Sequence, residues 1–128
     1  PREVFLEVKR TRYNFLSSHH QTPEVLSAYQ WYVAQLLNRH VMLPSGEVTL
    51  QTRGNPSGQI STTMDNNMVN YFLQAFEFAY LRPDYAEADL DDEWSISDTL
   101  IYGDDRLSAV HSMPVDYVER VVAMYADV

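Results

Sequence analysis

The stretch Tyr102-Gly103-Asp104-Asp105 decides how this chain is interpreted. An apolar run, residues 99–101, precedes it, and residues 106–110 have a second strand pattern. Two strand patterns separated by Gly and Asp predict a β-hairpin with two carboxylates at its tip. Gly103 suits this turn, because glycine adopts positive φ and lets another backbone come close.

The adjacent carboxylates of Asp104 and Asp105 repel each other unless a cation lies between or beside them. Such compact oxygen donors are typical ligands of Mg²⁺ or Mn²⁺. The alternative is an ordinary exposed turn, since Gly and Asp are turn residues in proteins of any function. The rest of the chain has to separate these two interpretations.

Composition limits the possible functions. The length of 128 residues fits one domain, and the absence of cysteine excludes a disulfide framework, a thiol nucleophile and a Cys-based zinc site. A reducing, intracellular setting is therefore expected. The formal net charge of −9 argues against a self-sufficient nucleic-acid binder. No apolar run approaches the length of a membrane span.

Apolar residues recur at helical spacing in four places. We expect helices over residues 2–16, from a cap at Thr22 to about residue 38, from Ile60 to about Leu81, and from Met113 onward. The third helix also has a polar stripe, formed by Thr62, Asn66 and Asn70. Whether this stripe faces the protein or the solvent is open from the pattern alone.

The segments between these helices give four further expectations. Residues 41–52 predict a hairpin with a turn at 44–46. Ser57 and Gly58 are expected at the start of the third helix, where free N–H groups attract anions. His19 and His20 are interpreted as a loop pair rather than a metal site. Residues 84–93 hold six carboxylates and predict a solvated surface loop rather than a calcium site.

The pattern Ser57-Gly58-x3-Thr62-x3-Asn66, followed by Tyr102-Gly103-Asp104-Asp105, resembles the second and third signature motifs of viral RNA-dependent RNA polymerases. Residues 36–41, 43–52, 53–59, 61–68 and 73–78 look like the astrovirus polymerase in particular. The resemblance covers most of residues 31–107, and the acidic stretch matches least.

The resemblance implies an α+β fold, the palm subdomain of a right-hand polymerase, in which helices back a small antiparallel sheet with a Gly-Asp-Asp hairpin. Residues 1–40 would be palm helices that follow the absent first motif. Residues 41–56 would be a hairpin leaning into the fingers, and residues 57–128 the palm core. Pro1 is not an initiator Met, so we expect a segment that begins just after the first motif and is inactive by itself.

The same resemblance implies RNA-templated RNA synthesis, by nucleotidyl transfer with two Mg²⁺ (or Mn²⁺) ions, for a positive-strand RNA virus. One ion would lower the pKa of the primer hydroxyl and the other would hold the triphosphate. The resemblance implies Asp104 as the principal and Asp105 as the secondary metal ligand. Thr62 and Asn66 would lie beside the ribose of the incoming nucleotide. Ser57 and Gly58 would form a flexible loop that adjusts to the template and nucleotide, and Arg53 and Gly103 would contact the RNA.

The implied partners are the RNA template and nascent strand, nucleoside triphosphates, and the remaining fingers, palm and thumb. The implied location is the host cytoplasm, in membrane-associated replication complexes. Two other interpretations stay open. One is a reverse transcriptase or DNA polymerase palm, against which Gly103, Thr62 and Asn66 argue. The other is a non-enzymatic acidic domain that binds a basic partner.

Overall fold

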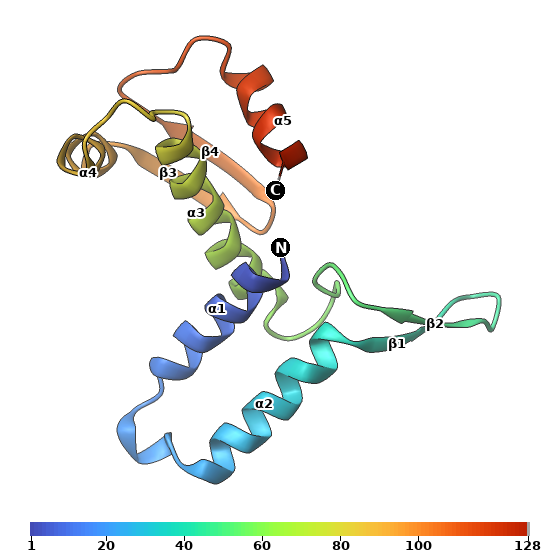
Figure 1. Cartoon of the computed structure of the whole chain (residues 1–128). Coiled ribbons are helices and arrows are strands. Elements are labelled where there is room, and N and C mark those ends of the chain that lie inside the picture. The colour runs from blue at the N-terminus through green and yellow to red at the C-terminus, as the bar shows by residue number, and fades with distance from the viewer. Residues whose placement is uncertain (128) are drawn as a thin grey trace. The chain divides into compact units, whose positions relative to one another are not determined.

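The computed structural model describes residues 1–127 and has two compact units, residues 1–69 and residues 70–128. The first unit contains α1 (Arg2–Asn14), a 3-10 turn η1 (Ser18–His20), α2 (Pro23–Leu37), β1 (Arg39–Met42) and β2 (Val48–Gln51). The second contains α4 (Glu87–Ser95), β3 (Asp98–Tyr102), β4 (Asp105–Ala109) and α5 (Tyr117–Asp127). The long helix α3 (Thr62–Tyr80) begins in the first unit and continues into the second (Figure 1).

These elements confirm the mixed α+β class. Within residues 1–127 there are five α-helices and two separate two-stranded antiparallel hairpins. None of the helices in this part of the chain is both long and apolar enough to cross a membrane.

In the first unit, α1 and α2 form the helix pair that the periodicity predicts. The Thr22 hydroxyl accepts a hydrogen bond from Val25 N at 3.3 Å, and Pro23 fills the first helical position, as expected for a capped helix start. Val8 on α1 is buried, as are Val33 and Leu36 on α2.

The first hairpin pairs Arg39 with Gln51 and Met42 with Val48, and therefore begins two residues earlier than predicted. The Arg39 side chain explains this start. Its guanidinium donates to the carbonyl oxygens of Leu36, Arg53 and Gly54 at 2.9, 2.9 and 3.0 Å. One side chain thus joins the end of α2 to the segment that follows β2.

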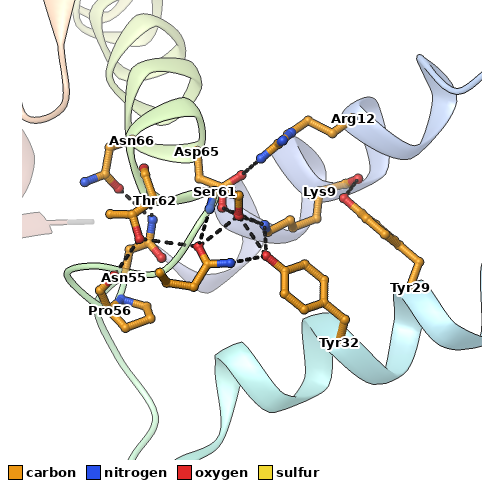
Figure 2. A network of polar contacts seen from close by, with 11 residues as sticks. Lys9, Arg12, Tyr29, Tyr32, Asn55, Pro56, Ser61, Thr62, Asp65 and Asn66 are labelled. Atoms are coloured by element: carbon orange, nitrogen blue, oxygen red, sulfur yellow. Dashed lines mark hydrogen bonds and ion pairs between the residues drawn. The ribbon is translucent and has the colours of Figure 1, made fainter.

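The core of the first unit contains a buried ion network (Figure 2). The Asp65 side chain, which is 0% exposed, accepts from Lys9 Nζ through Oδ2 and from Arg12 Nη1 through Oδ1, both at 2.6 Å. The Ser61 hydroxyl also donates to Oδ2 at 2.8 Å. Tyr29 donates from its hydroxyl to the Lys9 carbonyl at 2.9 Å, which ties α2 to the same point of α1.

In the second unit, the hairpin β3–β4 has the register Thr99↔Ser108, Ile101↔Arg106 and Tyr102↔Asp105. Paired residues share a face, and successive pairs along the hairpin lie on opposite faces. The outer face is solvent-exposed, with Leu100, Tyr102 and Leu107 at 72%, 75% and 73% exposure. The inner face carries Arg106 and Ser108, which bond to α3 as described below.

Glu77 of α3 joins three elements of the second unit. Its carboxylate, almost fully buried, forms an ion pair with Arg106 of β4 and accepts from the hydroxyls of Tyr117 and Tyr125, at 3.2 and 2.6 Å, at the two ends of α5. Burial, together with the hydrogen bond to Glu77, raises the pKa of Tyr125, and burial beside the Glu77 charge raises that of Tyr117. A neutral phenol is required for these bonds.

Several sequence expectations were wrong in detail. Residues 87–93 of the predicted loop 84–93 belong to α4, because Trp94 packs on Phe78 at 5.2 Å between ring centroids and Arg82 pairs with Glu93 at 3.2 Å. The Ser112 hydroxyl, followed by the Arg82 charge, lowers the pKa of Glu93. Helix α5 begins at Tyr117 rather than Met113.

The faces of α3 also differ from the simple amphipathic expectation. Ile60 lies outside the helix and is 97% exposed, and Met64, Phe72, Phe76 and Tyr80 retain between 38% and 56% exposure. The polar stripe is half-buried and makes hydrogen bonds to the protein. The alternative that this stripe is merely the wet face of the helix is therefore wrong.

Replacing Asp65 with Ala should lower the free energy of unfolding by about 3–5 kcal/mol, because two cations, one of them buried, would lose their partner. Urea denaturation of the protein measures this change. Asp91→Ala, which removes an exposed carboxylate of α4, is the matched control and should cost less than about 0.5 kcal/mol. Equal effects of the two substitutions would contradict a stabilising role for the network.

The Tyr125 bond should stabilise the fold in a pH-dependent way. Because the folded pKa is raised above the ordinary value of 10.0, the contribution is complete below that pH and is lost as the pH rises through the folded pKa. The difference in melting temperature between the native chain and Tyr125→Phe should therefore narrow above pH 10. Tyr80→Phe, at a similarly exposed tyrosine, should show no such narrowing.

Candidate functional site

The predicted carboxylate turn is present. Tyr102 and Asp105 form the last pair of β3–β4, so Gly103 and Asp104 are the two turn residues. Gly103 has φ +67° and Asp104 does not have positive φ, a combination that fits a type II′ hairpin turn. A residue with a Cβ would be strained at Gly103, although the space around it is open.

Asp104 and Asp105 are both exposed, but they belong to different elements. Asp104 is in the turn, whereas Asp105 is the first residue of β4 and shares the outer face with Tyr102. Within residues 1–127 neither carboxylate takes part in an ion pair with a basic side chain. The Coulomb repulsion between them is thus not offset by a neighbouring cationic side chain.

The donor set fits a divalent cation in type but not in number. Adjacent carboxylates supply hard oxygen ligands of the kind that Mg²⁺ and Mn²⁺ prefer. No group of three or more His, Cys, Asp or Glu side chains that could hold an ion occurs in the described part of the chain. An ion at this turn would need further oxygen ligands from water, a substrate or other protein groups.

The second motif lies in the first unit, at the start of α3 (Figure 2). The Thr62 hydroxyl donates to the Pro56 carbonyl at 2.5 Å, and Asn55 donates from Nδ2 to Oδ1 of Asn66 at 2.9 Å. Both candidate ribose groups are therefore held by residues 55–56. Since these bonds use the Thr62 proton and the Asn66 oxygen, Thr62 can offer lone pairs to a ligand and Asn66 its NH₂ group.

Ser57 and Gly58 are exposed, and Gly58 has φ +79°. The expectation that they sit at the helix start was wrong, because α3 begins at Thr62. Gln59, one of the three residues between Gly58 and the helix, accepts through Oε1 from Ser61 N at 2.8 Å and from Ser61 Oγ at 2.9 Å. The Ser61 N–H group already donates to a side-chain oxygen and is not free to bind an anion. This weakens the interpretation of the segment as an anion site.

Arg53 is exposed, and its carbonyl is held by Arg39. His19 and His20 lie in the η1 turn with their rings 3.9 Å apart, which agrees with a loop pair. Thr62 and Asn66, in the first turns of α3, belong to the first unit, and the carboxylate turn belongs to the second.

Two positions that organise these motifs were not predicted from the sequence, Arg39 and the buried Asp65. Asn70 was noted only as a member of the polar stripe, without its contact to the turn. Asp65 had a signal, because Lys9 and Arg12 lie three residues apart on one face of α1 and both lie toward the core. Arg39 had none, since carbonyl partners have no sequence signature.

Comparisons with known proteins identify the family. Residues 7–128 match the family model described as viral RNA-dependent RNA polymerase. The chain is 55% identical over 128 residues to the non-structural polyprotein 1AB of Ovine astrovirus 1 and 57% identical over 129 residues to that of Human astrovirus-1. The identity to the Turkey astrovirus 2 polyprotein is 39% over 136 residues.

Each alignment covers 100% of this chain but only 10%, 8% and 8%, respectively, of the three polyproteins. A comparison with solved structures finds no match. The family match extends beyond residues 31–107, where the sequence resemblance was noted, toward both ends of the chain. The chain therefore belongs to the viral RNA-dependent RNA polymerase family.

Proposed function

We propose that this chain is the central palm segment of an astrovirus-type polymerase and takes part in RNA-templated RNA synthesis for a positive-strand RNA virus. The observation that carries this proposal is the exposed Asp104-Asp105 pair on a two-residue hairpin turn within a member of the polymerase family. The family match supports the reaction class, and the hairpin provides the carboxylates that the reaction requires.

Asp104 is the principal metal ligand in this proposal and Asp105 the secondary one. Bound divalent ions would promote loss of the proton from the attacking hydroxyl and neutralise the triphosphate. The chain supplies adjacent oxygen donors on a turn whose backbone path is limited by Gly103 and by the register of β3–β4. Gly103 has no side chain that would obstruct an approaching RNA backbone.

Thr62 and Asn66 would recognise the ribose of the incoming nucleotide. A hydroxyl group both donates and accepts, and the pair can offer an acceptor from Thr62 and a donor from Asn66. This complementarity supports selection of the 2′-OH, the group that separates RNA from DNA precursors. Ser57 and Gly58 would adjust to the nucleotide, and Arg53 would contact backbone phosphate.

The remaining organisation is also part of the proposal. Residues 1–40 would be palm helices, residues 41–56 a hairpin toward the fingers, and residues 57–128 the palm core. The partners would be RNA template and product, nucleoside triphosphates, and the other fingers, palm and thumb parts. RNA synthesis would take place in membrane-associated replication complexes of the host cytoplasm.

Asp104→Ala in a complete polymerase that carries this segment should lower RNA synthesis by at least about 100-fold, since a metal ligand contributes several kcal/mol to transition-state stabilisation. The melting temperature should hardly change, because an exposed carboxylate adds little stability. Asp98→Ala, at an exposed position of the same hairpin, is the control and should retain synthesis. Synthesis that survives Asp104→Ala would instead favour the acidic interaction domain.

Asn66→Asp should reduce the preference for ribonucleotides over deoxyribonucleotides by about tenfold, the value of roughly one hydrogen bond. The substitution keeps the oxygen that accepts from Asn55 but removes the NH₂ group. Competition between the two nucleotide types, measured by primer extension, gives the ratio. Thr63→Val on the exposed side of α3 is the control. A native enzyme that prefers deoxyribonucleotides would favour the reverse transcriptase interpretation.

A further inference from the structure

The polar stripe of α3 ends at Asn70, and two further polar residues, Gln74 and Glu77, continue along the helix beside the carboxylate hairpin. Asn70, Gln74 and Glu77 are spaced by four and three residues and therefore lie on one helix face. Within the second unit all three contact the hairpin. Asn70 bonds to the turn, Glu77 to Arg106, and Gln74 donates to the Ser108 hydroxyl at 2.8 Å.

Asn70 contacts the backbone on both sides of Asp104. Its Nδ2 lies 3.2 Å from the Gly103 carbonyl oxygen and 3.4 Å from that of Asp105. An amide nitrogen carries two hydrogens, so one side chain can serve both carbonyls. The Gly103 carbonyl belongs to the peptide unit before Asp104 and the Asp105 carbonyl to the peptide unit after Asp105, so holding both of them limits rotation of the backbone that carries the Asp pair.

Asn70, Gln74 and Glu77 bond to different parts of the hairpin. Gln74 and Glu77 are almost fully buried and attach to side chains of β4 that lie, respectively, three residues and one residue beyond Asp105. Asn70 is half-buried and attaches to the backbone of the turn itself. Since neither Asp carboxylate forms an ion pair within residues 1–127, their directions depend mainly on the backbone that carries them.

We propose that Asn70 is a positioning residue for the metal-binding turn: by holding the carbonyls of Gly103 and Asp105, it fixes the direction in which Asp104 and Asp105 present their carboxylates to divalent cations. The inference rests on the proposed function, because it assumes that the pair binds metal. It adds a residue that touches neither cation nor nucleotide but sets the geometry of those that do. Groups of this kind typically change metal affinity about 10- to 100-fold.

The test compares Asn70→Leu with Gln74→Met in a complete polymerase. Leu is close in size to Asn but donates no hydrogen bond, and Gln74→Met removes a bond from the same helix face at a greater distance from the turn. Mn²⁺ binding is measured by calorimetry without RNA or nucleotide, and amide hydrogen exchange is followed over residues 102–109. Asn70→Ala is the second variant, should Asn70→Leu fail to fold, because Ala favours helix.

The expected result is a Mn²⁺ dissociation constant raised about 10-fold or more by Asn70→Leu, with faster exchange at residues 103–105. Gln74→Met should change exchange at residues 107–109 and leave Mn²⁺ affinity within about twofold of the native value. The Mn²⁺ concentration for half-maximal synthesis should rise in parallel for Asn70→Leu alone.

Unchanged Mn²⁺ affinity in a folded Asn70 variant would overturn the inference, even if its melting temperature fell, because a merely structural bond would have that effect. Equal loss of affinity in Gln74→Met would overturn it as well. Asp104→Ala separates this failure from failure of the proposed function. If Asp104→Ala retains Mn²⁺ binding and synthesis, the metal role itself fails; if it loses both while Asn70→Leu loses neither, only the positioning role of Asn70 fails.

Discussion

The requirement that buried polar groups find partners shapes this chain more than apolar packing does. The interior of α3 carries Asp65, Gln74 and Glu77, all at least 94% buried; Asp65 is tied to α1, and Gln74 and Glu77 are tied to β4. An unpaired polar group in such a position costs free energy, so Asp65 and Glu77 require their partners once they are buried. Gln74 is paired through its Nε2 atom, while its buried Oε1 atom has no partner within the described residues. Apolar side chains can shift along one another and stay in contact, whereas these directional bonds form only at one position of α3 relative to the neighbouring element.

This constraint places the two motifs of the family on equivalent supports. In the first unit, Asn66 and Thr62 hold residues 55–56 through bonds to a side chain and a backbone carbonyl. In the second unit, Asn70 holds the turn in the same way, through backbone carbonyls. Short polar side chains on a helix are suited to this task, because the helix fixes their origin and few rotatable bonds remain.

The sequence predicts the parts that depend on local rules. The Gly103 turn, the Thr22 cap and both hairpins follow from residues that are adjacent in the chain, and all are present. Helix α4 was missed because its acidic composition suggests solvent, while the contacts that stabilise it, through Trp94 and Glu93, come from α3 and from Arg82 just after it. The exposure of the apolar residues of α3 could not be predicted either. Helical periodicity shows that they share one face of the helix but not whether another element packs on that face.

Rigid support of the turn has a further physical consequence for the carboxylate pair. Two adjacent Asp side chains on a freely moving loop would reduce their repulsion by rotating apart, and a cation would then have to bring them together again. A turn limited by the positive φ of Gly103, the last strand pair and the Asn70 bonds has less freedom to do so. In the proposed metal site, repulsion that the turn maintains before a cation binds would be relieved by the cation, and this relief would add to the free energy of binding. Preorganisation of this kind makes backbone bonds, remote from the reacting atoms, part of the chemistry of the site.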